Sequence, residues 1–244
     1  MKKLFGFLTL FIVLNITTVY FFLFTSFGNG IISEAIEKNI NEQGVVTLKI
    51  ENFTLTTDSI NLKAVIDNNS FVNVAGTFNL LAKSIDVKYD ADIKDLSKLQ
   101  KFTTQKLNGD VKVSGTVIGN QELIVIKGIT NIFESQSSYS VNLKDFEPSN
   151  INYEIKKAKI DKLLYTVNQP IYAKGFIDIT GDILNAKPES LDGRIATKVY
   201  EGNVNLPIVN NDFNLTLKSP LKFNGDILTS LEPYKLVSKV DPVL

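Results

Sequence analysis

The sequence predicts a mainly β protein, in which an N-terminal transmembrane helix is followed by a curved antiparallel β-sheet with two or three short helices. Three observations support this prediction. Between Lys3 and Glu34 the chain carries no charged residue, from Val45 onward apolar and polar residues alternate, and one glycine-bracketed segment occurs twice. We expect three regions: an anchor at 1–28, a juxtamembrane helix or linker at 29–42, and a β-rich domain at 43–244.

The N-terminal stretch is long enough to cross a membrane. Residues 4–27 are mostly apolar, and about 20 such residues span a bilayer as a helix. A cleaved secretory signal is the alternative, but its apolar region is usually about 7–15 residues long and precedes a small-residue cleavage site. Lys2 and Lys3 precede the stretch, so the positive-inside tendency predicts a cytoplasmic N-terminus. In a bacterium with two membranes, the rest of this single-pass inner-membrane protein is then periplasmic.

The segment after the anchor has two interpretations. Gly28 to Gly30 predicts a break in the chain, and apolar residues from Ile31 to Ile40 then fall at helical spacing. A short amphipathic helix here either lies at the membrane surface or caps the first strand.

The strands are predicted from period-two alternation. Residues 84–94 alternate without a break, although an average strand has only about 5–6 residues. One face of such strands is apolar and the other carries lysine and aspartate, as in an antiparallel sheet that is wet on one side. Further alternating runs lie at 46–50, 60–66, 72–80, 151–155, 195–199, 213–217 and 221–223, and turns are expected at 68–69, 119–120, 210–211 and 224–225. Residues 95–102 and 159–168 predict short helices, and 230–240 is ambiguous.

The repeated segment holds the glycines. Leu107-x-Gly-x-Val-x-Val-x-Gly-x-Val117 is followed 66 residues later by Ala173-x-Gly-x-Ile-x-Ile-x-Gly-x-Ile183. Glycine inside a strand usually marks a bulge, a bend or the close approach of another group. The repeat therefore predicts a curved sheet built from a recurring strand. The alternative is that the glycines only relieve crowding in an ordinary sandwich core.

Composition argues against an enzyme. The chain has no cysteine and no histidine, one arginine (Arg194), and 26 basic against 26 acidic residues. We therefore expect no catalytic residues, no metal site, no cofactor and no nucleic-acid partner. The aspartates between Asp86 and Asp95 are expected to form a solvated face, and the S-x-x-K pattern at 219–222 lies in a strand-like run, where a hydrolase site is not expected.

An anchor followed by repeated LxGxφxφxGxφ strands, with DIKDLSKL at 92–99 after a long alternating strand, resembles the AsmA-like envelope proteins. The segment 157–183 resembles them as well. The resemblance spans most of the chain, and these relatives are anchored in the inner membrane and related to TamB-type repeating-β-groove proteins. It implies a taco-like groove or open half-barrel with an apolar concave face that shelters lipid acyl chains. Because such proteins are usually much longer, a short member or a fragment is expected.

Two functions follow as hypotheses. The first is an inner-membrane-anchored groove protein that binds or conducts phospholipid or glycolipid in the cell envelope. Its partners would be lipid acyl chains, the inner membrane and other envelope proteins. The second is a membrane-tethered β-sandwich or jelly-roll scaffold that assembles with other envelope proteins without carrying lipid. The lipid-groove candidates are Val111, Val113, Val117, Ile177, Ile179 and Ile183.

Overall fold

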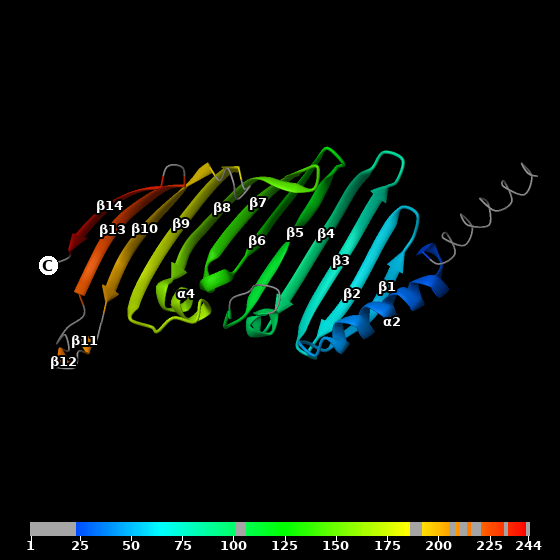
Figure 1. The fold of residues 1–244 in the computed structure, drawn as a ribbon, viewed down its shortest axis with the longest axis horizontal. Coiled ribbons are helices and arrows are strands. Elements are labelled where there is room, and N and C mark those ends of the chain that lie inside the picture. The colour runs from blue at the N-terminus through cyan, green and yellow to red at the C-terminus, as the bar shows by residue number, and fades with distance from the viewer. Residues whose placement is uncertain are drawn as a thin grey trace, which may run out of the picture.

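The computed structural model describes residues 23–100, 106–185, 192–204, 208–209, 214–215, 221–231 and 234–242. Its main element is a 12-stranded antiparallel sheet in which β1 to β10 follow in chain order and β13 and β14 complete the row (Figure 1). The strands are β1 (Leu48–Leu55), β2 (Ser59–Ile66), β3 (Ser70–Asn79), β4 (Ser84–Ile93), β5 (Val111–Asn120), β6 (Leu123–Thr130), β7 (Gln136–Lys144), β8 (Glu147–Lys159), β9 (Ala173–Asn185), β10 (Asp192–Val204), β13 (Leu221–Leu231) and β14 (Tyr234–Pro242). The short strands β11 (Ile208–Val209) and β12 (Asn214–Leu215) pair separately. The sheet is open, with β1 and β14 at its two ends.

The predicted mainly β, antiparallel class is confirmed. Each hairpin is a simple up-and-down connection, so every strand from β2 to β9 pairs with its two neighbours along the chain. The alternation did not reveal β6 and β7, and the ambiguous segment 230–240 spans the end of β13 and most of β14. No second sheet covers the 12-stranded one among the described elements, so these residues form an open single layer and not a sandwich.

One of the expected turns is confirmed and two are wrong. Asp67 and Asn68 have positive φ between β2 and β3. Gly119 and Asn120 lie inside β5, where they pair with β4, and the turn follows them; the Asn120 side chain accepts hydrogen bonds from the backbone of this turn at 3.0 and 3.1 Å. Asn224 and Gly225 likewise lie inside β13, where they pair with β14. The turn expected at 210–211 lies outside the described residues. The tertiary pairing of a strand thus overrides local turn chemistry at 224–225.

The short helices lie at one end of the strands. A 3₁₀ helix, η1 (Leu96–Leu99), follows β4, another, η2 (Ile132–Glu134), joins β6 to β7, and α4 (Ile160–Thr166) joins β8 to β9. The helix expected at 159–168 is confirmed by α4, and that at 95–102 by η1 in its described part. Leu164 of α4 and Leu96 of η1 are buried, so each of these helices packs an apolar side chain at this end of the strands.

The helix α2 (Ser26–Glu42) precedes the sheet. Thr25 caps its N-terminus, with its hydroxyl accepting a hydrogen bond from the Gly28 N–H at 3.2 Å. The break expected at 28–30 is therefore wrong, because those residues lie inside the helix and the chain bends at Thr25. Most of the expected anchor at 1–28 lies outside the described residues. Within the described part, no helix is long and apolar enough to cross a membrane.

The inner side of α2 caps the free edge of β1 (Figure 1). Asn29 exchanges two hydrogen bonds with the Leu55 backbone, at 3.1 and 3.2 Å, and Asn41 exchanges two with the Leu48 backbone, at 3.0 and 2.6 Å. Glu37 accepts from the Ile50 N–H at 2.5 Å. These side chains satisfy backbone groups that an edge strand would otherwise expose. The capping interpretation of this helix is confirmed.

The candidate binding face and its tyrosine–glycine row

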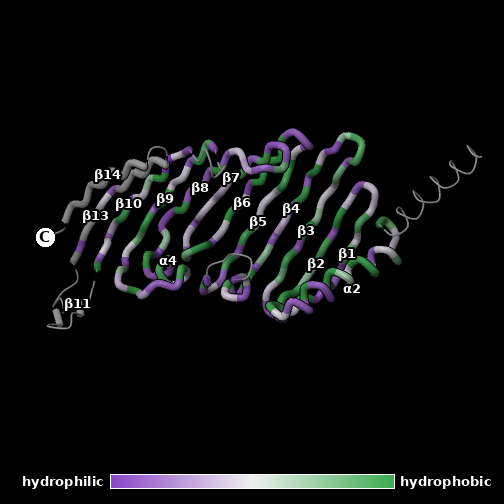
Figure 2. Tube along the Cα trace, in the orientation of Figure 1, coloured by the Kyte–Doolittle hydropathy of each residue, from purple (hydrophilic) through white to green (hydrophobic). Residues whose placement is uncertain are grey.

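The six lipid-groove candidates lie on one face of the sheet. Directly paired residues of neighbouring strands point to the same side, so the register defines rows that run across the strands. One row contains Val87, Val117, Ile126, Val141, Ile151 and Ile183, and another contains Ala91, Val113, Thr130, Ser137, Ile155 and Ile179. Val111 pairs with Ile93, and Ile177 with Ala158. We call this side the apolar face; Figure 2 shows the alternation along the strands that produces it.

A row of tyrosines and glycines runs between these two rows, of which the first is aliphatic and the second also contains Thr130 and Ser137. It consists of Tyr89, Gly115, Gly128, Tyr139, Tyr153 and Gly181, each paired with the next across β4 to β9. We call it the tyrosine–glycine row. Every strand of the six contributes either a tyrosine or a glycine, so each large ring has a glycine beside it.

The glycines make room for the rings. A side-chain carbon at position 128 would lie 2.5 Å from the Tyr139 hydroxyl and 2.7 Å from that of Tyr89. At position 115 it would lie 2.5 Å from the Tyr89 hydroxyl, and at 181 it would collide with the ring of Tyr153. The tyrosine rings therefore lie over the glycines, and the second glycine of each repeated segment marks the close approach of another group. The first glycines differ, since Gly109 and Gly175 adopt φ of +94° and +121°, which favour glycine.

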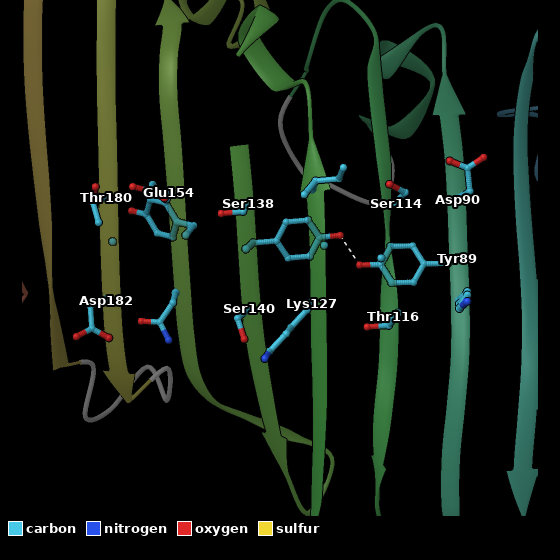
Figure 3. Close-up of a pocket in the computed structure, with 18 of the residues that line it drawn as sticks. Tyr89, Asp90, Ser114, Thr116, Lys127, Ser138, Ser140, Glu154, Thr180 and Asp182 are labelled. Carbon is cyan, nitrogen blue, oxygen red and sulfur yellow. Dashed lines mark hydrogen bonds between the residues drawn. The ribbon is translucent and has the colours of Figure 1, made fainter. Parts of the chain in front are cut away.

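The three hydroxyl groups of this row are bonded differently. The Tyr89 and Tyr139 hydroxyls are 2.5 Å apart and form a hydrogen bond in which either oxygen can be the donor; Figure 3 marks it with a dashed line. Burial raises the pKa of Tyr139 well above its ordinary value, and the bond to Tyr89 adds to the rise. Burial also raises the pKa of Tyr153, whose hydroxyl has no hydrogen-bond partner among the described residues. All three side chains are half-buried.

A large hollow lined by the described residues lies on the other, polar face. Its volume is about 1180 Å³, and besides the tyrosine–glycine row it is lined by residues that flank this row along β3 to β9. They include Lys88, Asp90, Ser114, Thr116, Ser138 and Ser140, several of which are labelled in Figure 3. None of the six lipid-groove candidates lines this hollow. Hydroxyl groups and charges of both signs stand among its lining residues. The hollow thus lies on the side of the sheet opposite the six residues that were expected to line an apolar groove.

One aspartate of the polar face departs from the expected solvated face. Asp86 and Asp90 are exposed, but Asp92 is only 6% exposed. Its carboxylate binds Lys94 at 2.8 Å and Lys112 at 3.4 Å, and the hydrogen bond from Lys94, followed by the contacts with Lys112, holds its pKa below the ordinary value although burial opposes this. Within the described part of the chain no group of acidic residues could hold a metal ion.

The same face carries a second bound carboxylate, on β9. Burial opposes the ionisation of Asp178, but the Lys157 N–H at 2.7 Å and the Tyr200 hydroxyl at 2.6 Å hold its pKa below the ordinary value. Burial and this contact raise the pKa of Tyr200 to about 12. Lys157 lies in the bulge of β8 between Ile155 and Ala158, so Asp178 satisfies an N–H that the bulge removes from the ladder.

Sequence analysis missed the tyrosine–glycine row. Tyr89 and Tyr153 lie in predicted strands, but nothing local shows that they share a row with glycines on other strands. Comparisons with known proteins add nothing here, since no protein-family model, curated protein or solved structure matches the chain.

Proposed function

We propose that the chain is a membrane-anchored lipid-binding protein of the cell envelope, and that its apolar face carries lipid acyl chains. The observation that carries the proposal is a continuous apolar face, from β1 to β10, that no second layer of the described chain covers. From usual strand spacings this face measures about 45 by 27 Å, or about 1,200 Å². Exposed apolar patches on monomeric soluble proteins rarely exceed about 300–600 Å². A face of this size therefore calls for an apolar occupant.

Two further features support lipid as that occupant. An acyl chain costs about 0.8 kcal/mol per CH₂ to hold in water, so a carrier needs an apolar track without interruption. The row through Val117, which is aliphatic on every strand from β4 to β9, provides such a track across the strands. The apolar stretch at 4–27 supports a membrane near the start of the sheet, and the resemblance to AsmA-like proteins points to the same function.

The start of α2 supports the position of the membrane. Phe27 is 61% exposed and Ile31 is 41% exposed, and they lie four residues apart, so they share one side of the helix. Because Asn29 and Asn41 fix α2 to the β1 edge, a membrane that contacts Phe27 and Ile31 would lie next to the first strands. Lipid could then pass from the membrane to the apolar face at β1.

Photo-crosslinking of the full chain in bacterial cells tests the proposal. The photoreactive residue p-benzoyl-phenylalanine replaces Val113 or Ile179 on the apolar face, and Ser114 or Thr180, the next residues along each strand, as matched controls on the polar face. We expect adducts with the mass of a lipid at 113 and 179 but not at 114 and 180. Adducts with a second copy at 113 and 179, or equal lipid labelling on both faces, would contradict the proposal.

The second candidate is a scaffold that binds an envelope partner by strand addition. The edge of β1 is capped by α2, whereas β14 pairs only with β13 among the described strands. An unpaired edge strand is a template for a further strand. The same photoreactive residue at Lys239 of β14 would give a discrete protein adduct if this edge binds a partner, and none if the chain acts only on lipid.

A further inference from the structure

We propose that the tyrosine–glycine row is the specificity site of the apolar face, where phenol O–H groups bind the carbonyl-type oxygen at the head of an acyl chain. This inference rests on the proposed lipid-binding function and adds to it the part of the lipid that is recognised. The row would select acyl esters and fatty acids over plain hydrocarbon chains of equal length.

The argument begins with a count of hydrogen-bond donors. A phenol carries one O–H donor and can also accept a hydrogen bond. In the Tyr89–Tyr139 pair one hydroxyl donates to the other, which leaves the proton of the accepting hydroxyl unused. The Tyr153 hydroxyl has no partner among the described residues. Three tyrosines thus leave two O–H groups free to donate, beside a row that is aliphatic from Val87 to Ile183.

The glycines place these donors within reach of a ligand. Because Gly115 and Gly128 lie beneath the paired hydroxyls and Gly181 beneath the Tyr153 ring, the rings lie low over the sheet. The Tyr139 and Tyr153 rings point along the row in opposite directions, toward β5 and toward β9. Their donors therefore occupy two separate positions, roughly 15 Å apart from strand spacing, each beside the aliphatic row through Val117.

The preferred ligand follows from this chemistry. A buried or half-buried donor without an acceptor is unfavourable, and a site built to donate a hydrogen bond discriminates against an analogue that lacks the acceptor. Phenols have an ordinary pKa of about 10 and are protonated at neutral pH, and burial raises the pKa of Tyr139 and Tyr153 further, so both act as neutral donors. Ester carbonyls and carboxylates are acceptors that an acyl chain carries at its head, whereas an alkane carries none.

The experiment compares two diazirine probes on the full chain in detergent: a sixteen-carbon acyl methyl ester and the matching alkane. The variants are the triple substitution Tyr89→Phe, Tyr139→Phe and Tyr153→Phe, and the control Tyr200→Phe. Tyr200 lies on the polar face, where its hydroxyl already binds Asp178 at 2.6 Å. Phenylalanine keeps each ring over its glycine and removes only the hydroxyl.

We expect the native chain and Tyr200→Phe to label with the ester about fivefold more than with the alkane, because the single ester carbonyl accepts one hydrogen bond at either position, and one hydrogen bond of ordinary strength contributes about this factor. In the triple variant the ratio should fall to about one through loss of ester labelling. An unchanged ratio in the triple variant would overturn this inference and leave the proposed function intact. Failure of both probes to label the native chain would overturn both.

A single variant provides the same test if the triple variant does not fold. Tyr153→Phe removes a hydroxyl that makes no bond within the described residues, so the fold should be unaffected. Its ester-to-alkane ratio should fall to about three fifths of the native value, because one of the two separate positions loses its preference for the ester. A native ratio in a folded Tyr153→Phe chain would show that this hydroxyl does not contact the ligand, and would overturn the assignment of Tyr153.

Discussion

The strands β5 and β9 carry the same repeated segment of sequence. The second glycine of each copy lies in the tyrosine–glycine row, but the two glycines have different neighbours. Gly115 of β5 lies beneath the hydroxyl of Tyr89 from β4, and Gly181 of β9 lies beneath the ring of Tyr153 from β8. In both cases the preceding strand supplies the tyrosine. Between them β6 and β7 reverse the order, with Gly128 preceding Tyr139.

The atoms that would collide with an added side chain differ between the two glycines. A methyl group at 115 would collide with the carbonyl oxygen of Lys127, which belongs to the backbone of β6, in addition to approaching the hydroxyl-bonded Tyr89. The three atoms nearest to a methyl group at 181 all belong to the side chain of Tyr153, whose hydroxyl has no partner among the described residues. Both repeated glycines thus leave room for a neighbouring tyrosine ring. The other contacts of each glycine determine how much stability is lost when it is replaced by a larger residue.

The largest predicted effect tests this difference directly. We expect Gly115→Ala to lower the free energy of unfolding by about 3 kcal/mol or more, because backbone cannot move aside, and Gly181→Ala to lower it by about 1 kcal/mol, because the Tyr153 ring can. Denaturant unfolding of the full chain in detergent, followed by far-ultraviolet circular dichroism, measures both. Equal losses would show that the carbonyl oxygen of Lys127 does not set the constraint at 115.

The polar faces of the same two strands also differ. Lys112 of β5 and Asp178 of β9 occupy equivalent positions of the repeat, 66 residues apart. Lys112 is one of two cations that bind the buried Asp92, whereas Asp178 is held by two neutral donors, Lys157 N–H and the Tyr200 hydroxyl. The sheet therefore stabilises one carboxylate by ion pairs and the other by hydrogen bonds.

The dependence of stability on pH and on salt concentration should distinguish the contributions of these two carboxylates. Both pKa values are lowered in the folded chain, so each carboxylate stabilises the fold above its unfolded pKa of about 4, and this contribution is lost as pH falls below that value. We expect Asp92→Asn to cost about 2 kcal/mol at neutral pH, in the range of hydrogen bonds to charged groups, and to flatten the acid limb of the stability curve.

Raising the salt concentration from about 0.1 to about 1 M, which shortens the screening length from about 10 to about 3 Å, sharpens the comparison. The effect of Asp92→Asn should shrink in high salt, and the effect of Asp178→Asn should change less. The same salt dependence for both would mean that Lys156 and Lys198, which act on Asp178 only weakly, hold it more strongly than its neutral donors do.

Period two was sufficient to predict the faces of the sheet but not its rows. Alternation placed Val113 and Ile179 on one side because neighbouring side chains of a strand point to opposite faces. The row that joins Tyr89 to Gly115 and Gly181 depends on the lengths of the intervening turns and on the bulge near Lys157, which alternation does not report. The burial of Asp92 was missed for the same reason, since Lys112 comes from the next strand, after a long connection.

The smallest predicted effect concerns a glycine without close neighbours, which serves as a comparison for the glycines of the sheet. Gly30 lies within α2, and a side-chain carbon at this position would meet nothing within 4 Å. Because glycine in a helix is less favourable than alanine by about 0.5–1 kcal/mol, we expect Gly30→Ala to raise the free energy of unfolding by about that amount, opposite in sign to Gly115→Ala. The same denaturant experiment measures it. A loss of stability instead would show that the side of α2 carrying Gly30 is in contact with other groups. Gly30 would then resemble the glycines beneath the tyrosine rings.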